Sequence, residues 1–293
     1  MENGFMIIDI HTHIFPDEIA PRAMASLIED AHTRPFCDGT ASGLCKSRRE
    51  AGIDWCVALP VATSPRQVIH MNDRAILTND IRRETGLISF GGIHPDFEDW
   101  KRELERLARS GIKGIKLHPV FQKVNLDDLR YLRIMERAAE LGLAILTHAG
   151  VYVDRPDSAF CTPRMALQVF KELGKVPMIL AHMGGWRQWD EAEEIIPQIP
   201  FYLDTAYCLG PIVPFDQGSW QGGPLNTMPR DQFLRFIKLA GANRILFGTD
   251  SPWRDQKESV ESILNLPITE GEKRAILGEN AAKLLGLKDY HAK

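Results

Sequence analysis

Short runs of apolar, often β-branched residues alternate along the chain with segments whose apolar residues recur about every 3.6 positions. This alternation predicts eight strands, each followed by helical or loop sequence. The predicted strands span residues 5–10, 54–61, 87–94, 112–118, 143–149, 177–183, 200–206 and 244–250. Strand–crossover–strand units run parallel and right-handed, so the pattern predicts a distorted (β/α)8 TIM barrel of the α/β class.

An open, doubly wound sheet is the alternative topology. It is disfavoured because neither G-x-G-x-x-G nor G-x-x-x-x-G-K-[ST] follows any predicted strand. The chain has no internal repeat, low-complexity tract or change of composition, so we expect residues 1–293 to form a single barrel domain. Two long connections, at about 15–52 and 207–229, are expected to cover the C-terminal mouth of the barrel.

The segment 126–142 illustrates the helical pattern. Its apolar positions indicate one buried stripe, which we expect to pack on the outside of a parallel sheet. The stripe comprises Leu126, Leu129, Leu132, Met135, Ala139 and Leu141. Gly142 follows it and is expected to end the helix, because glycine adopts the left-handed conformation common at helix C-termini.

Composition narrows the functional class. The chain is 44% hydrophobic and 25% charged with a net charge of -4, so no basic surplus indicates nucleic-acid binding. Its five cysteines are odd in number and scattered, which favours reduced thiols and a cytoplasmic location. The N-terminus has no signal-peptide pattern, and no apolar run approaches the roughly 18 residues of a membrane span.

The first predicted strand runs into the sequence His-Thr-His. Because side chains alternate along a strand, His11 and His13 should project from the same face, with Asp9 on that face one step earlier. Two adjacent imidazoles are suited to a metal ion, although satisfied polar residues at a strand end are an equally common outcome for such a pair. Asp9 is expected either to orient an imidazole or to cap a backbone turn.

Other chemically capable side chains also fall at the C-terminal ends of predicted strands. His94, His118, His148, His182 and Asp250 end the third, fourth, fifth, sixth and eighth strands. Active sites of barrels are built at that face from several strands, so these groups can converge although they are distant in sequence. Together with the His-x-His pair they favour a metal site.

These residues lie in motifs that resemble those of the amidohydrolase superfamily, and specifically its amidohydrolase-related (amidohydrolase 2) branch of metal-dependent hydrolases and decarboxylases. The motifs are DIHTH, THAG, AHMGG, FGTDSPW and the C-terminal ILGENAAKLLGL. The resemblance implies a distorted (β/α)8 barrel with one or two divalent metals, most often zinc, at its mouth. It further implies His11, His13, His148 and Asp250 as metal ligands, and His182 as a second-site ligand or catalytic residue.

Imidazoles and a carboxylate are suitable zinc ligands, and bound zinc lowers the pKa of a water to roughly 7. Asp250 is expected to take the water proton and pass it to a leaving group, while His182 polarises the carbonyl or stabilises an oxyanion.

Lys116 and His118 share a strand face in the sequence GIKGIKLHP. In parts of the superfamily a carboxylated lysine of the fourth strand bridges two metals. Lys116 is expected either to play that role, to bind a substrate carboxylate as a cation, or to extend out of the barrel to solvent. We expect one strongly held metal, since an unmodified lysine would repel a second cation.

Loops after the strands carry further candidates for substrate binding, namely Tyr152, Arg155, Arg187 and Trp253, with Trp186, Tyr207 and Arg254 nearby. Arginines can bind a carboxylate with two hydrogen bonds, and aromatic side chains can line a pocket for a planar substrate. We therefore expect a small, anionic substrate.

The sequence thus predicts a metal-dependent hydrolase that acts on a small amide, lactone or other ester, and we expect this substrate to carry a carboxylate. One alternative is non-oxidative decarboxylation of an aromatic or unsaturated acid, and another is a non-catalytic, ligand-binding barrel. Partner proteins are not indicated, and a homo-oligomer is compatible with the sequence.

Overall fold

The computed structural model describes residues 6–153, 157–215 and 227–287. Its strands are β1 (Ile8–Thr12), β2 (Trp55–Ala58), β3 (Leu87–Ser89), β4 (Gly91–Gly92), β5 (Gly114–Leu117), β6 (Ala144–Thr147), β7 (Met178–Leu180), β8 (Tyr202–Asp204) and β9 (Ile245–Leu246). They pair in parallel in the orders β1-β2-β3 and β4-β5-β6-β7-β8-β9. Every neighbouring pair is sequential, which is the strand order of a (β/α)8 barrel and not of a doubly wound sheet.

The third predicted strand, 87–94, is divided into β3 and β4 by Phe90, whose side chain is buried inside the barrel. On the opposite side, backbone hydrogen bonds join β1 to the segment that follows β9. The Ile10 amide donates to the carbonyl of Phe247 at 2.9 Å, and the Asp250 amide donates to the carbonyl of His11 at 2.8 Å. The first strand therefore lies beside the last, and the barrel is distorted as expected.

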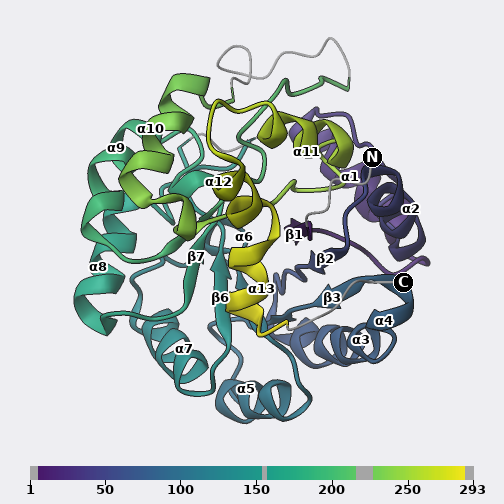
Figure 1. The fold of residues 1–293 in the computed structure, drawn as a ribbon. Helices are drawn as coiled ribbons and strands as arrows, with labels where there is room; N and C mark the ends of the chain where they lie inside the picture. The colour runs from purple at the N-terminus through teal and green to yellow at the C-terminus, as the bar shows by residue number, and fades with distance from the viewer. Residues whose placement is uncertain (1–5, 154–156, 216–226, 288–293) are drawn as a thin grey trace.

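The helices surround the strands (Figure 1). Their bounds are α1 (Ala20–Ala31), α2 (Ala41–Ala51), α3 (Val68–Asp80), α4 (Arg82–Thr85), α5 (Trp100–Arg109), α6 (Pro119–Gln122), α7 (Leu129–Glu140), α8 (Pro163–Leu173), α9 (Trp189–Ile195), α10 (Arg230–Ala240), α11 (Gln256–Leu264), α12 (Glu270–Arg274) and α13 (Asn280–Leu285). Side-chain N-caps fix several of their starts, because a side-chain oxygen accepts from an otherwise unpaired backbone amide. These caps are Thr40, Asp128, Thr162, Asp255 and Thr269.

Helix α7 confirms the predicted stripe in part. Leu126, just before the helix, and Met135 are buried, and Leu132, Ala139 and Leu141 pack against the core. The prediction is wrong for Leu129, whose side chain is 58% exposed, and the helix also buries Tyr131, Ile134 and Ala138. The cap at Asp128 starts the helix three residues later than the predicted segment, which turns Leu129 away from the barrel. Gly142 lies just beyond the last turn with φ of 71°, as expected for the glycine that ends a helix.

The barrel interior is filled by apolar side chains at the N-terminal ends of the strands. Alternate residues of the strands, such as Ile8, Ile10 and Trp55, point inward and contact Ala281 and Leu285 of α13. Helix α13, yellow in Figure 1, crosses the N-terminal end of the barrel. This end is closed by packing, so access to the interior is left to the opposite, C-terminal end.

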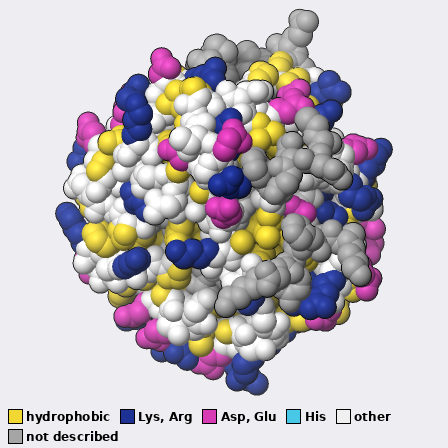
Figure 2. Space-filling view, in the orientation of Figure 1, with side chains coloured by type: hydrophobic (Ala, Val, Ile, Leu, Met, Phe, Trp, Pro, Cys, Tyr) yellow, Lys and Arg dark blue, Asp and Glu magenta, His cyan; other side chains and the backbone are white. Residues whose placement is uncertain are grey.

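The two long connections pair with each other. Thr33 forms an antiparallel bridge with Pro214, and the Phe215 amide donates to the carbonyl of His32 at 2.9 Å. The first connection contains α1 and α2, whereas residues 216–226 of the second lie outside the described residues. On the face shown in Figure 2, acidic and basic side chains are interspersed without one large patch of either sign.

Candidate active site

A local irregularity in β1 places its two histidines. The register between β1 and β2 shifts between Asp9 and Thr12. The rings of His11 and His13 lie 5.1 Å apart at the C-terminal end of the barrel, as predicted. Asp9 does not join them: its carboxylate accepts from Thr249 Oγ1 at 2.5 Å and Gln256 Nε2 at 2.8 Å. The expectation that Asp9 shares their face is wrong because the register shift interrupts the simple alternation of side chains.

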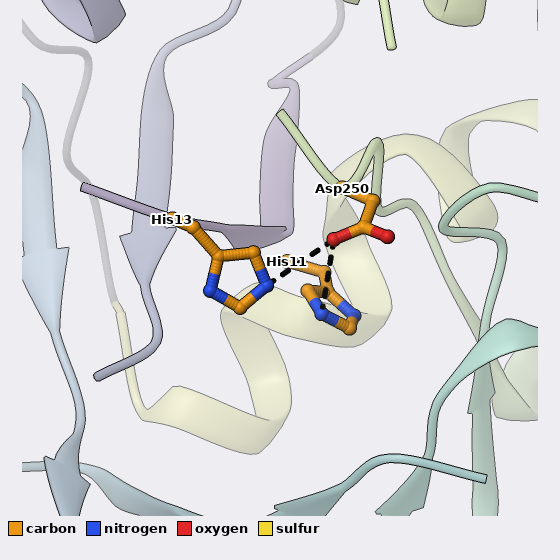
Figure 3. A group of neighbouring side chains, drawn as sticks. All are labelled: His11, His13 and Asp250. Carbon is orange, nitrogen blue, oxygen red and sulfur yellow. Dashed lines mark ion pairs between the residues drawn. The ribbon is translucent and has the colours of Figure 1, made fainter. Parts of the chain in front are cut away.

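Asp250 reaches the same point from the segment after β9. Its Oδ1 lies 3.2 Å from His13 Nε2 and 3.5 Å from His11 Nε2, and Figure 3 shows both imidazoles beside its carboxylate. The ligand atoms of these three residues all lie within 4.8 Å of one another. Asp250 has φ of 66°, and such backbone strain in a non-glycine residue is common at functional sites.

Each of four imidazoles has one ring nitrogen directed at a hydrogen-bond acceptor of the barrel. The contacts are His11 Nδ1 to Asp204 Oδ2 at 2.8 Å, His13 Nδ1 to the Leu59 carbonyl at 3.0 Å, His148 Nε2 to the Val151 carbonyl at 3.3 Å, and His182 Nδ1 to the Ala206 carbonyl at 2.8 Å. Carbonyl oxygens only accept, so in each contact the imidazole is the donor. A neutral imidazole carries a proton on only one ring nitrogen. The second ring nitrogen of each of these histidines therefore has an unshared electron pair.

These unshared pairs face one another or a carboxylate. His148 Nδ1 lies 3.1 Å from His182 Nε2, and His13 Nε2 lies 3.2 Å from Asp250 Oδ1. Two electron pairs at such distances repel unless a cation lies between or beside them. The donor set therefore fits a divalent cation, because imidazole ligands of metals commonly donate their other N–H to a carbonyl or carboxylate.

Asp204, at the end of β8, is a functional residue that the sequence analysis missed. Its Oδ2 accepts from His11, and its Oδ1 accepts from the backbone amides of His182 and Ala206 at 2.8 and 3.0 Å. Burial raises the pKa of Asp204, while the neighbouring His182 and these hydrogen bonds oppose the rise. It fixes the orientation of His11 and the backbone of His182. A buried carboxylate at a strand end was the signal available in the sequence.

The other predicted ligand, His148, lies between His182 and His118. It contacts His182 through the 3.1 Å nitrogen pair and stacks on His118 with ring centroids 4.5 Å apart. Its position depends on Gly150, whose φ is 90° and whose missing side chain lets the chain pass against the backbone of Trp186. The THAG motif thus brings the fifth and sixth predicted strands together at the site.

Lys116 lies inside the barrel and does not extend to solvent. Its side chain is 1% exposed, and its Nζ lies 3.3 Å from His11 Nε2. Among the described residues it forms no ion pair within 4.0 Å. Burial lowers the pKa of Lys116 to about 8, although Asp204 and Asp250 oppose this shift. Burial also lowers the pKa of His11, and the positive charge of Lys116 lowers it further.

Asp250 and His118 differ from the other site residues in proton affinity and tautomer. Burial alone would raise the pKa of Asp250, but the adjacent His11 and His13 hold it well below its usual range. His118 Nδ1 accepts from the amide of Phe121 at 3.4 Å, so its proton is on Nε2. His118 is therefore a hydrogen-bond donor on that nitrogen, unlike the four imidazoles above.

A cavity of about 1110 Å³ opens over this cluster. Tyr152, Trp186, Tyr207 and Trp253 line it, together with His11, His13, Lys116, His118, His148, His182 and Asp250. Arg187 is not among the lining residues and lies over the ring of Trp186, 5.8 Å from its centroid. Arg254 donates to the carbonyl of Pro211. The predicted Arg155 lies outside the described residues.

His94 also lies apart from the cluster. Its Nδ1 accepts from the amide of Asp96 at 3.1 Å, and it does not line the cavity. Of the strand-end histidines, His94 is therefore the one with a local structural contact instead of a place in the site.

Comparison with protein families shows which family the chain belongs to. A model of the amidohydrolase family matches residues 8–287. The chain belongs to the amidohydrolase family. This confirms the resemblance indicated by the strand-end motifs, and it makes the chain a member of a family of metal-dependent enzymes. No curated protein sequence matches the chain.

Solved structures share the fold. A 5-carboxyvanillate decarboxylase from Sphingomonas paucimobilis is 17% identical, with 97% of this chain and 100% of that chain covered and a TM-score of 0.70. An uncharacterised TIM-barrel protein from Bordetella bronchiseptica is 19% identical, with 96% and 98% covered and a TM-score of 0.73. A dihydroxybenzoic acid decarboxylase from Polaromonas sp. JS666, with bound manganese and the inhibitor 2-nitroresorcinol, is 18% identical, with 98% of each chain covered and a TM-score of 0.66.

At these identities the similarity establishes the barrel fold that this amidohydrolase family member shares with them.

None of the helices in the described part of the chain is long and apolar enough to cross a membrane.

Proposed function

We propose that this amidohydrolase family member is a metal-dependent hydrolase of a small carbonyl compound that carries a carboxylate. In this proposal one divalent cation is held by His11, His13, His148 and Asp250. The observation that supports it is the pair of unprotonated nitrogens of His11 and His13 beside the Asp250 carboxylate, in a cavity that His148 also lines with its unprotonated Nδ1. Zinc suits imidazole and carboxylate ligands, and manganese is bound in one of the similar structures.

When bound, the cation supplies a Lewis acid that polarises the substrate carbonyl and acidifies a water. The protein supplies the proton acceptor. His182 is held by its Nδ1 donation to the carbonyl of Ala206, which leaves Nε2 without a proton, and the side chain lines the cavity. Asp250 Oδ1 lies within 3.5 Å of Nε2 of both His11 and His13, so its carboxylate shares the position that the cation would take. We therefore assign proton transfer to His182 and metal binding to Asp250.

Lys116 and His118 are placed to hold the substrate carboxylate. Both side chains line the cavity and are buried, and both project from the end of β5. Lys116 is a cation without a carboxylate partner among the described residues, and His118 offers its Nε2 proton. A charged pair formed in such a buried place is stronger than one on the surface.

We propose one cation per chain. A second cation bridged to the first through Lys116 would lie beside the lysine ammonium, and the two positive charges would repel each other. A carboxylated Lys116 would remove that repulsion and bridge two metals. Metal analysis of protein prepared with added bicarbonate distinguishes the two cases, since two metals per chain that fall to one in Lys116→Ala would contradict our proposal.

Decarboxylation of an aromatic acid is a second candidate function. It is favoured by the fold neighbours named as decarboxylases of 5-carboxyvanillate and dihydroxybenzoic acid. The aromatic side chains around the cavity, such as Tyr152 and Trp253, suit a planar ring. In this candidate Lys116 would hold the carboxylate that is lost.

A panel of substrates separates the two functions. Protein loaded with zinc or manganese is incubated with carboxylate-bearing lactones, amides and aryl esters, and with hydroxybenzoates. We expect release of acid from the first group. Release of carbon dioxide from a hydroxybenzoate would instead assign the decarboxylase function, and absence of turnover on every compound would favour a non-catalytic barrel.

The variant His182→Ala tests the assigned base. We expect it to keep its metal and to lose about 100-fold or more in kcat, a loss typical of removing one catalytic proton-transfer group. Full activity in this variant would contradict the assignment, and loss of the metal would make His182 a ligand.

A further inference from the structure

The cavity extends well beyond the metal cluster. Its volume of about 1110 Å³ exceeds the range of about 300–1,000 Å³ that is common for small-molecule sites. One part is lined by the strand-end residues described above. Another part is lined by α1 and by the segment that runs from Pro65 through α3. A substrate confined to the metal cluster would leave this second part unused.

Helix α3 and the 3₁₀ turn before it direct a basic face at this second part. Arg66, His70 and Arg74 are spaced four residues apart, so they project from one side of the helical segment, and all three line the cavity. Arg74 Nε donates to His70 Nε2 at 3.3 Å, and its guanidinium lies 3.6 Å from the Glu18 carboxylate. Arg66 forms no ion pair within 4.0 Å among the described residues.

We propose that Arg66 and Arg74 form a second anion-binding subsite that selects elongated, doubly anionic substrates. The inference rests on the proposed function, because it assumes that one carboxylate binds at Lys116. The second anionic group, a carboxylate or a phosphate, binds the two guanidinium groups, which donate to either group with matching geometry. The chain between them crosses the cavity, whose lining includes the apolar side chains of Ile14 and Val153.

Glu18 limits this subsite. Its carboxylate neutralises part of the charge of Arg74, and it is 75% exposed, so it can move away at little cost when a ligand binds. Asp17 also lines the cavity and repels an anion. An anion must therefore compete with Glu18 for Arg74, and removal of the Glu18 charge should strengthen binding.

Titration calorimetry with simple acids tests the subsite on zinc-loaded protein. The probes are linear dicarboxylates from succinate to sebacate and monocarboxylates of the same chain lengths. We expect the dicarboxylates to reach an optimum length at which they bind about 5-fold or more tightly than the matched monoacid. The double variant Arg66→Gln/Arg74→Gln should remove this advantage and leave the affinity for monoacids unchanged.

Three further variants control the measurement. Glu18→Gln should increase the dicarboxylate advantage, a gain that a merely structural role of Arg74 would not produce. Arg109→Gln, at an exposed position of α5 away from the cavity, should change nothing. Lys116→Met should weaken monoacids and dicarboxylates alike, which separates the inner carboxylate site from the outer one.

Each outcome decides one of the two proposals. A dicarboxylate advantage that survives loss of both arginines, or that is absent at every length, overturns the outer subsite. Tighter binding of ω-amino acids than of dicarboxylates would also overturn it and would assign that part of the cavity to Glu18 and Asp17. If Lys116→Met leaves all affinities unchanged, the inner carboxylate contact of the proposed function fails, while an arginine-dependent advantage would still support the outer subsite.

Discussion

The two ends of this barrel are built from the same strands but carry opposite chemistry. At the N-terminal end, Ile8 and Trp55 pack against Leu285 of α13, and the interior is apolar and closed. At the C-terminal end, imidazoles and the carboxylate of Asp250 surround the base of a large cavity. Polar groups are costly to bury unless they are paired, so the first end contributes stability and the second contributes the site that we propose to hold a cation.

The difference also appears in how each end is specified. Apolar side chains at the closed end need only fill space, and substitutions there alter packing. Each imidazole at the open end needs one particular acceptor behind it, such as Asp204 for His11. Variants at the two ends should therefore affect different measurements.

The largest effect is expected at the open end. The double variant His11→Ala/His13→Ala should lose nearly all bound metal, because it removes two of four proposed ligands. It should remain folded, since strand-end ligands add little to the packed interior. Elemental analysis and circular dichroism check both points, and full metal occupancy in this variant would refute the proposed ligand set.

The next effect concerns the closed end. Trp55→Ala should lower the free energy of unfolding by about 3–5 kcal/mol, the range measured when a large buried aromatic side chain is removed. Metal content per folded molecule should stay unchanged. Denaturant unfolding measures the first quantity, and a loss of metal without a loss of stability would show that the two ends are not separable.

A smaller effect is expected at the residue behind His11. Asp204→Asn should weaken metal binding by about 10–100-fold, as is usual when the partner of a metal-bound imidazole is removed. Asp9→Asn is the matched control. Burial raises the pKa of Asp9 to about 7, and its carboxylate contacts no imidazole, so an amide should replace it with little change in metal affinity. Equal losses in both variants would contradict the separate roles.

The smallest effect is expected on the outside of the barrel. Leu129→Gln should change the free energy of unfolding by no more than about 0.5 kcal/mol, because its side chain is 58% exposed. Ile134→Ala, five residues later on the buried face of α7, should cost about 2–5 kcal/mol. A loss in Leu129→Gln as large as that in Ile134→Ala would place Leu129 on the buried face, as the sequence predicts.

Local patterns in the sequence account for the barrel and for the place of its site. Alternating apolar runs specify parallel strands, and chemically capable residues at their C-terminal ends must meet at one face. His11, His13 and Asp250 were found in this way, and the structure places their ligand atoms within 4.8 Å of one another. These features follow from local periodicity and from the geometry of parallel strands, which act over a few residues at a time.

The groups that support the site depend on contacts between distant parts of the chain. Asp204 became the partner of His11 because β8 and β1 bring residues 193 positions apart to 2.8 Å, and no local pattern encodes that contact. The register shift in β1 turned Asp9 away from the imidazoles, and the start of α7 turned Leu129 to solvent. Likewise, the spacing of Arg66 and Arg74 is visible in the sequence, but only packing of α3 against β3 and β4 directs them into the cavity. Such contacts depend on register and on helix rotation, and a change of one residue in either redirects a side chain.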